Sequence, residues 1–371
     1  MGTITTANPL IFSATSLPAG WDAARIFSLM EAAFSEAFTT HSVRVLERRC
    51  IFAGQVAELR IIGHKLAEHI VPAISHLLRA DREAPPRLKI DFWHESETGV
   101  SCPINFIDFP EPDYPAWRSG QYGFTVGSPD DRFIGRRRFQ MFMWLDRETQ
   151  HIIGWARNGK EFSALERANP VRFPLSLWHS DRGAEVIHAG LVAKNGFGIL
   201  LGGKGGAGKT TTALVCLSSG FEYLGDDYIG LQASNDGSFI GHSLYSSAWL
   251  PKDNLFRFPA LVPHAKRGDY AGRERYLVFL HPLFPGQCAS SAPIRALILP
   301  RVASAPLARL RPAKKSEALL ALAPTSIINL PSSGSRALRN LASLVERVPC
   351  FWLELGSDLK AIPRCLEEVI S

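Results

Sequence analysis

The stretch Gly203–Thr210, GKGGAGKT, satisfies the phosphate-binding pattern G-x4-G-K-[ST]. Glycines permit backbone angles that turn successive N–H groups toward phosphate oxygens, and a helix that begins near Lys209 adds its positive end. Lys209 would reach the outer phosphates, and the Thr210 hydroxyl would ligate Mg²⁺. The residues that we expect to hold a nucleotide are Gly203, Lys204, Gly205, Gly206, Ala207, Gly208, Lys209, Thr210 and Thr211.

Two adjacent carboxylates, Asp226 and Asp227, follow Lys209 by 17 and 18 positions. One helix and one strand fill this interval, so the pair is expected at the sheet edge beside the loop, where ligands bind in open α/β sheets. Because neighbouring residues on a strand point to opposite sides, we expect two roles. One carboxylate would face Mg²⁺, and the other would deprotonate an acceptor hydroxyl. The alternative is one metal-binding Asp and one that caps a turn.

His188 lies on a predicted strand, residues 185–193, which joins a second strand, residues 197–203, through Asn195-Gly196. Asn-Gly is the preferred two-residue hairpin turn. If the two strands pair, His188 comes near the edge that carries the loop, where it can bond the catalytic Asp or the transferred phosphate. The alternative is a core histidine with satisfied hydrogen bonds.

Predicted strands and helices alternate over residues 184–371 and must position these residues. This alternation predicts an α/β nucleotide domain. We expect strands at 221–227, 275–280, 294–300 and 350–356, and helices at 209–219, 335–348 and 357–370. Residues 1–183 read as an α+β domain. It has helices at 21–38 and 64–80, strands at 56–63 and 87–95, loops over 103–135 and two strands within 137–159.

Composition places the 371-residue chain among globular proteins, with 46% apolar and 20% charged residues. The sequence shows neither a membrane-spanning run nor a secretory signal, and its six cysteines form no CxxC pair, so we expect a cytoplasmic protein. The basic run Arg136–Arg138 lacks interleaved aromatics, which argues against nucleic acid. The net charge of +6 is read instead as attraction for nucleotide phosphates or an acidic partner.

The segment from Ile187 to Ile229 resembles the catalytic core of HPr kinase/phosphorylase. That family has a histidine-bearing strand, a hairpin, the phosphate loop, a short helix and an Asp-Asp pair in this order. The resemblance implies the mixed-sheet fold shared with phosphoenolpyruvate carboxykinase, and ATP and Mg²⁺ as cofactors. It implies Asp226 as the base, Asp227 and Thr210 as magnesium ligands, and His188 as the group that tunes the base.

The remainder of the chain departs from true HPr kinases, because no equivalent of their later signature segment is found. Arg273 and Arg275 are candidate phosphate clamps. The order of segments along the whole chain is more similar to that of the HPr-kinase-like proteins encoded beside peptide-tailoring genes. The segments that carry this resemblance are DDYIGL, SLYSSA (Ser243–Ala248) and LILPRV (Leu297–Val302). Some of these phosphorylate a serine of a lasso-type precursor peptide.

We therefore expect a kinase that acts on a serine of a peptide or small protein, which the N-terminal domain would present. A small-metabolite kinase, acting on free serine or an alcohol, and a nucleotide-dependent sensor without catalysis remain alternatives. ATP or GTP, reverse phosphorolysis and a homo-oligomer are left open.

Overall fold

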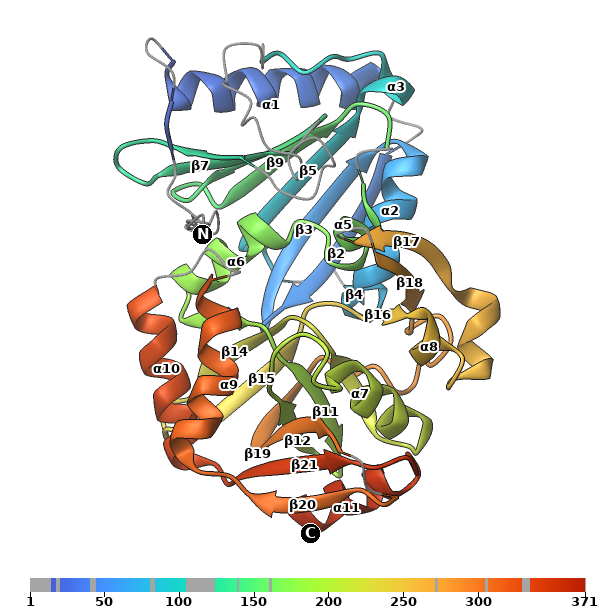
Figure 1. Cartoon of the computed structure of the whole chain (residues 1–371). Coiled ribbons are helices and arrows are strands. Elements are labelled where there is room, and N and C mark those ends of the chain that lie inside the picture. The colour runs from blue at the N-terminus through green and yellow to red at the C-terminus, as the bar shows by residue number, and fades with distance from the viewer. Residues whose placement is uncertain are drawn as a thin grey trace, which may run out of the picture.

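The structure, a computed structural model, describes residues 15–17, 21–40, 45–80, 84–104, 124–138, 140–159, 162–270, 273–303, 306–328 and 334–370. Strands and helices fall into two bodies stacked along the long axis, one built from the N-terminal half and one from the C-terminal half (Figure 1). Each body contains a mixed sheet with helices on both faces, so the predicted α/β class is confirmed.

The N-terminal sheet has the strand order β1-β6-β7-β8-β9-β5-β3-β2-β4. Its strands are β1 Thr15–Ser16, β2 Val45–Phe52, β3 Gln55–Ile62, β4 Leu78–Arg79, β5 Leu88–His94, β6 Phe124–Gly127, β7 Phe133–Arg138, β8 Met141–Asp146 and β9 His151–Ala156. The neighbours β3, β5 and β9 run parallel, whereas β8 pairs antiparallel with β7 and β9. The sheet is therefore mixed.

Side chains of alternating strand positions go to opposite faces of this sheet. On β8, Met141, Met143 and Leu145 join the core with helices α2 and α6, whereas Phe142 and Trp144 pack with α1. The helices are α1 Ala23–Thr40, α2 His64–Ile74, α3 Glu95–Thr98, α5 Ala164–Ala168 and α6 Arg172–Asp181, and a 3-10 turn, η2 Ser75–Leu77, follows α2.

The C-terminal sheet has the order β10-β14-β15-β19-β12-β11-β13, and β21 adds β20 beside β19. Its strands are β10 Ala184–Ile187, β11 Gly190–Lys194, β12 Phe197–Leu201, β13 Glu222–Gly225, β14 Ile229–Ala233, β15 Phe239–Ser243, β19 Ser291–Val302, β20 Arg309–Pro312 and β21 Cys350–Leu355. β12 runs parallel to β19, and β19 parallel to β21.

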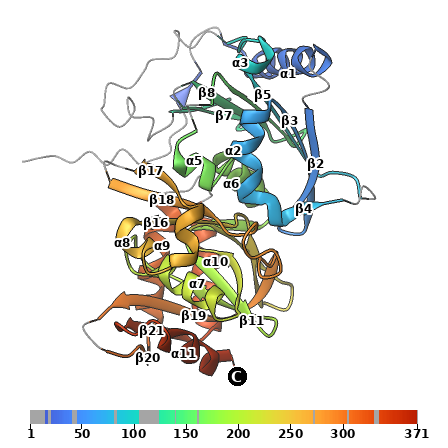
Figure 2. The ribbon, with the colours of Figure 1, turned by 90° about the vertical axis from the view of Figure 1, so that its right-hand side faces the viewer.

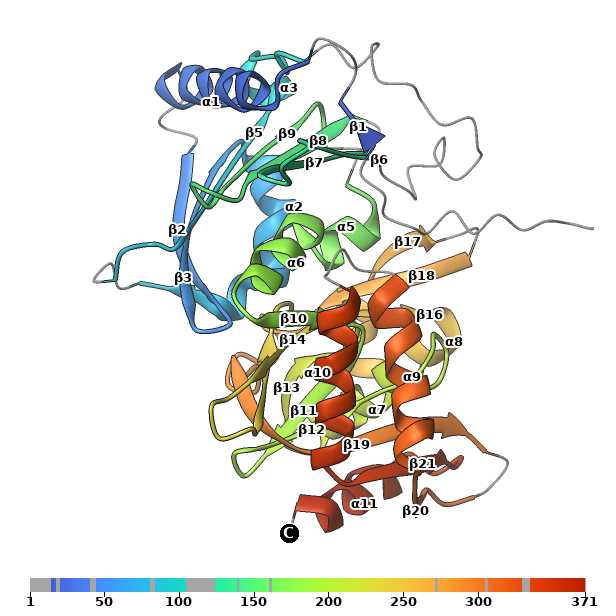
Figure 3. The ribbon, with the colours of Figure 1, turned by 90° about the vertical axis from the view of Figure 1, so that its left-hand side faces the viewer.

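Helices cover both faces of the C-terminal sheet. α9 Lys315–Ile328 and α10 Gly334–Arg347 lie side by side on one face (Figure 3). α7 Lys209–Ser218 and α11 Ala361–Ile370 share the core on the other face. Beside α7 lies a small sheet in the order β16-β18-β17, with α8 Lys252–Leu255 and the 3-10 segment η4 Pro259–His264. Its strands are β16 Ser247–Pro251, β17 Lys266–Tyr270 and β18 Arg273–Phe279.

Several sequence expectations need correction. The helix expected over 64–80 ends at Ile74, and Leu78–Arg79 forms β4, which pairs with β2. The strand expected over 185–193 is two strands, because the chain breaks at His188 and Ala189 and β10 pairs with β14 whereas β11 pairs with β12 and β13. The expected loop region 103–135 contains β6 and the start of β7, and residues 105–123 lie outside the described part. α9 was not expected, since apolar residues are spread around it rather than along one stripe.

In the described parts of the chain, no helix is long and apolar enough to cross a membrane.

Candidate active site

Strand pairing brings the loop, the histidine and the two aspartates to one edge of the C-terminal sheet. β11 lies between β12 and β13 and pairs antiparallel with both, so β12 and β13 end at the same edge. Gly190 faces Leu201 at the end of β12, and Leu191 faces Gly225 at the end of β13. His188 lies two residues before β11 begins and therefore comes near the same edge, as the hairpin predicted.

The loop after β12 holds its glycines in conformations that other residues rarely adopt. Gly203, Gly206 and Gly208 have φ angles of 139°, 84° and 108°. The Lys209 side chain is buried, and its Nζ donates a hydrogen bond of 2.7 Å to the carbonyl of Gly203. Burial lowers the pKa of Lys209, against the opposing charges of Asp227 and Asp226. This loop can present backbone donors and a lysine to an anion.

Asp226 follows β13 directly and is 5% exposed. Burial, together with the like charge of Asp227, raises the pKa of Asp226 to about 7. The nearby Thr210 and Tyr223 hydroxyls and the charge of Lys209 oppose this shift without cancelling it, although the Tyr223 hydroxyl donates its hydrogen bond to the carbonyl of Ser247 at 2.7 Å. A carboxyl group that titrates near neutrality is suited to accept a proton from an alcohol.

Asp227 has a different environment, because its Oδ1 lies 2.6 Å from His188 Nε2. Burial disfavours its ionised form, but the charge and hydrogen bond of His188, with Lys209 and Arg172, outweigh burial and lower the pKa of Asp227 to about 2. The backbone N–H of His188 donates to Ser326 Oγ at 3.0 Å, which ties this pair to α9. Asp227 therefore stays ionised at physiological pH.

The two carboxylates do have different partners, but not for the expected reason. The strand ends at Gly225, whose φ angle of 153° takes the chain out of the strand, so the pair lies in a bend beyond it. His188, expected beside the base, contacts Asp227 instead. Thr210, expected to share a metal with Asp227, lies close enough to Asp226 to lower its pKa.

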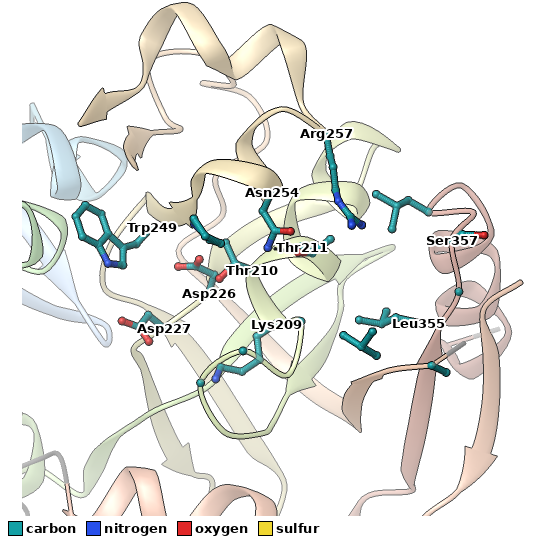
Figure 4. Close-up of a pocket in the computed structure, with 18 of the residues that line it drawn as sticks. Lys209, Thr210, Thr211, Asp226, Asp227, Trp249, Asn254, Arg257, Leu355 and Ser357 are labelled. Carbon is teal, nitrogen blue, oxygen red and sulfur yellow. Dashed lines mark hydrogen bonds between the residues drawn. The ribbon is translucent and has the colours of Figure 1, made fainter. Parts of the chain in front are cut away.

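These groups line one cavity of about 680 Å³. Figure 4 shows Asp226, Asp227 and Trp249 toward one end, Leu355 and Ser357 toward the other, and Lys209 and Thr210 between them. The wall also includes the expected residues His188, Gly205, Gly206, Gly208, Thr211 and Arg275. Of the other expected residues, Gly203, Lys204 and Ala207 belong to the loop but not to the wall, and Arg273 lies outside the cavity on β18.

Sequence reasoning missed several wall residues. Asn254 on α8 donates a hydrogen bond of 3.1 Å to Thr211 Oγ1, and Arg257 follows two residues after α8 ends. Trp249 directly follows the segment SLYSSA, and its position there could have marked it as a candidate site residue. Val302, Ala303, Pro306, Leu355 and Leu359 form an apolar wall from the ends of β19 and β21. Nothing in the local sequence marks these residues as neighbours.

The donor set suits a metal that arrives with a nucleotide. Among the described residues, no group of three or more His, Cys, Asp or Glu side chains could hold a metal ion. Mg²⁺ needs less protein, since it is commonly bound by one or two carboxylates plus substrate phosphates and water. The Thr210 hydroxyl and the carboxylates of Asp226 and Asp227 line the cavity beside the loop and supply oxygens of this kind.

The fold and site together define a mixed α/β protein with a phosphate-loop cavity that contains two unequal carboxylates. No protein-family model matches the sequence, and no curated protein matches it. Among solved structures, the chain is similar to the HPr(Ser) kinase/phosphatase from Coxiella burnetii, with 15% identity and a TM-score of 0.26, over 50% of this chain and 93% of that chain. A likeness this low carries no argument about function, which must come from the site itself.

Proposed function

We propose that this protein is an ATP- and Mg²⁺-dependent kinase that transfers a phosphoryl group to a hydroxyl, namely a serine of a small protein or a ribosomal precursor peptide. One observation carries the proposal: the cavity wall holds the Lys209 loop and both carboxylates, Asp226 and Asp227. Phosphoryl transfer requires a site that positions the phosphates, neutralises their charge and orients an acceptor, and this wall offers groups for each task.

In the proposed reaction, Asp226 accepts the proton of the acceptor hydroxyl as its oxygen bonds to the terminal phosphorus. The bond from that phosphorus to the bridging oxygen breaks, and ADP leaves. Lys209 and the loop N–H groups hold the phosphates, and Arg275 adds a positive charge from the cavity wall. Thr210 and Asp227 would hold Mg²⁺, which when bound spreads the phosphate charge. His188 keeps Asp227 ionised and oriented for this purpose.

The apolar end of the cavity is suited to a nucleobase. Leu355 is buried beside the loop, and Val302, Ala303, Pro306 and Leu359 complete a wall without charge. A planar base gains contact area on such a wall, and specificity comes from few polar groups such as Ser357. We therefore assign the nucleobase to the apolar end of the cavity and the acceptor to the end that holds Asp226 and Asp227.

The proposal includes the fold type and the division of labour. Residues 184–371 would form a catalytic domain of the HPr kinase and phosphoenolpyruvate carboxykinase type, and residues 1–183 would present the acceptor. We place the reaction in the cytoplasm, where ATP is supplied.

The test is incubation of the protein with Mg·ATP and serine peptides encoded near its gene, followed by mass spectrometry. The expected result is a gain of one phosphate on a serine, lost in the Lys209→Ala variant. Phosphorylation of free serine or an alcohol alone would move the proposal to a metabolite kinase. ATP binding without transfer to any acceptor, with nucleotide-dependent binding of a partner, would replace it with a sensor.

A further inference from the structure

One face of the small sheet β16-β18-β17 continues the wall of the active-site cavity. Pairing places Trp249, Leu277 and Lys266 in one row across the sheet, and Pro251, Arg275 and Gly268 in the next. Directly paired residues of antiparallel strands share a face. Trp249, Pro251 and Arg275 line the cavity, whereas Leu277 and Phe279 on the same face pack on α5. We call this the cavity-side face.

The opposite face of the small sheet packs on the core of the C-terminal body through its apolar side chains. Ala248, Leu250 and Val278 belong to that core with α7. The acidic residue Glu274 alternates with Arg273 and Arg275 and so lies on this other side, where it pairs with Arg267 at 3.0 Å. Glu274 therefore does not neutralise the cavity-side face.

Among side chains that the structure describes, the charged residues of the cavity-side face are all basic. We call Lys266, Arg273 and Arg275 the cationic face. Lys266 and Arg273 are exposed, and Lys266 Nζ lies 5.8 Å from the centre of the Phe279 ring on the same side. Figure 2 shows β17 and β18 extending outward from the C-terminal body, below the N-terminal body. The cationic face thus begins at the cavity with Arg275 and continues outside it.

The N-terminal body adds positive charge to the same junction. α5 packs on the cavity-side face at Gly268, where an added Cβ would come within 2.5 Å of Ala164 Cβ. Burial and the charge of Arg167 on α5, with His94 and Lys266, lower the pKa of His69 on α2 to about 4 against the opposing charge of Glu68. Arg167 and Lys266 therefore both lie close enough to His69 to act on it where the two bodies join. The phosphates of a nucleotide do not account for them, since Arg167, Lys266 and Arg273 are outside the cavity wall.

We propose that the cationic face binds an acidic peptide, so that the acceptor serine is flanked by glutamate or aspartate residues. This inference rests on the proposed function for the identity of the acceptor, but the binding surface stands on the charges alone. An acidic segment on the cationic face reaches the cavity at Arg275, whose Nη1 donates to the carbonyl of Trp249 at 3.4 Å. Trp249 lies toward the end with Asp226 and Asp227 (Figure 4). Complementary charge of this kind sets the choice of partner and the rate of encounter.

The test of binding compares two labelled peptides of equal length, each with one serine flanked by glutamates or by glutamines. Fluorescence anisotropy is expected to show the glutamate peptide binding roughly tenfold more tightly at low salt, with the difference shrinking as salt screens the charges. The double variant Lys266→Glu, Arg273→Glu is expected to lose the preference and to keep nucleotide affinity. The matched control is Arg25→Glu, Arg339→Glu, two exposed positions on α1 and α10, which should retain it.

Equal binding of both peptides, or an unchanged preference in the Lys266→Glu, Arg273→Glu variant, overturns the inference. A single-stranded oligonucleotide of matched charge that binds as tightly as the glutamate peptide also overturns it, in favour of general polyanion binding. Transfer is scored separately with Mg·ATP. Preferential binding without phosphorylation supports the role of the cationic face and refutes the proposed kinase activity. Phosphorylation of both peptides at equal rates supports the kinase activity and refutes the role of the cationic face.

Discussion

At the scale of single residues, the contrast between Asp226 and Asp227 is the strongest chemical feature of the site. Adjacent carboxyl groups with pKa values near 7 and near 2 are set apart by their surroundings: burial and a like charge for Asp226, and the His188 pair for Asp227. Such separation is typical of sites where one carboxyl group transfers protons and the other remains charged. This contrast supports the proposed role of Asp226 as the base.

Asp226→Asn is therefore expected to lower the transfer rate by roughly 10²- to 10⁴-fold, the usual contribution of a positioned base, while nucleotide affinity changes little. Single-turnover assays and nucleotide titration measure the two effects. Asp253→Asn on α8, an exposed position, is the control and should be silent. If Asp227→Asn stops transfer and Asp226→Asn raises only the Mg²⁺ requirement, then the two roles are exchanged.

The raised pKa of Asp226 also predicts how stability depends on pH. Its protonated form is favoured in the folded state, so its contribution is complete below pH 4 and is lost as the pH rises to about 7. A shift of about three units corresponds to a loss on the order of 4 kcal/mol. Urea unfolding at several pH values should show that the wild type loses this amount relative to Asp226→Asn between pH 4 and 7. Subtracting the unfolding free energy of the variant from that of the wild type removes the contribution of the buried histidines, which titrate in the same range.

His188 is expected to act on the metal through Asp227. Removing a residue that orients a metal ligand costs about 10- to 100-fold in metal affinity, so His188→Asn should raise the Mg²⁺ concentration needed for half-maximal nucleotide binding by about this factor. The exposed His264→Asn is the control. A change in the pH profile of Asp226 without any change in Mg²⁺ dependence would return His188 to the role of tuning the base.

At the scale of elements, the sequence predicted what local chemistry determines. The hairpin at Asn195-Gly196 is present with φ angles of 54° and 80°, and α7 begins at Lys209 with Gly220 in a left-handed conformation beyond its end. Local signals failed where tertiary pairing decides. The insertion of β11 between β12 and β13 leaves no mark in the sequence, nor does the approach of Leu355 to the loop. The aspartates lie at the predicted edge, but His188, expected beside Asp226, contacts Asp227 instead.

The loop offers a paired test of backbone geometry. Gly208 has a φ angle of 108°, and a Cβ there would lie 2.3 Å from Leu355 Cδ1, whereas Gly205 has open space around its added Cβ. Gly208→Ala should cost about 1–3 kcal/mol in stability and abolish nucleotide binding, because the loop must change shape to relieve the strain. Gly205→Ala should retain both. Thermal unfolding and nucleotide titration decide, and equal behaviour of the two variants would contradict the predicted loop geometry.

At the scale of the whole molecule, the segment Ser243–Ser247 joins the two bodies. Ser246 N–H donates to the carbonyl of Ala73 at 2.7 Å, Tyr245 OH to that of Pro170 at 3.0 Å, and Ser247 Oγ to that of Ala168 at 2.6 Å. Ser243 Oγ lies 2.7 Å from His76 Nε2. The segment SLYSSA (Ser243–Ala248) thus holds the N-terminal body beside Trp249 and the aspartate end of the cavity.

The core crosses the proposed boundary at residue 184, which predicts that the bodies are not independent. Val186, Tyr228, Leu244 and Tyr245 are buried in the same cluster as the side chains of α2 and α6. Exposing each such side chain costs about 1.5–3 kcal/mol, so a fragment of residues 184–371 would lose an amount comparable to the 5–15 kcal/mol that stabilises a typical domain. Calorimetry should show one transition for the full chain, and the fragment should aggregate or unfold at a much lower temperature. A fragment that unfolds cooperatively near the temperature of the full chain, with unchanged nucleotide affinity, would show that the C-terminal body folds independently of the N-terminal body.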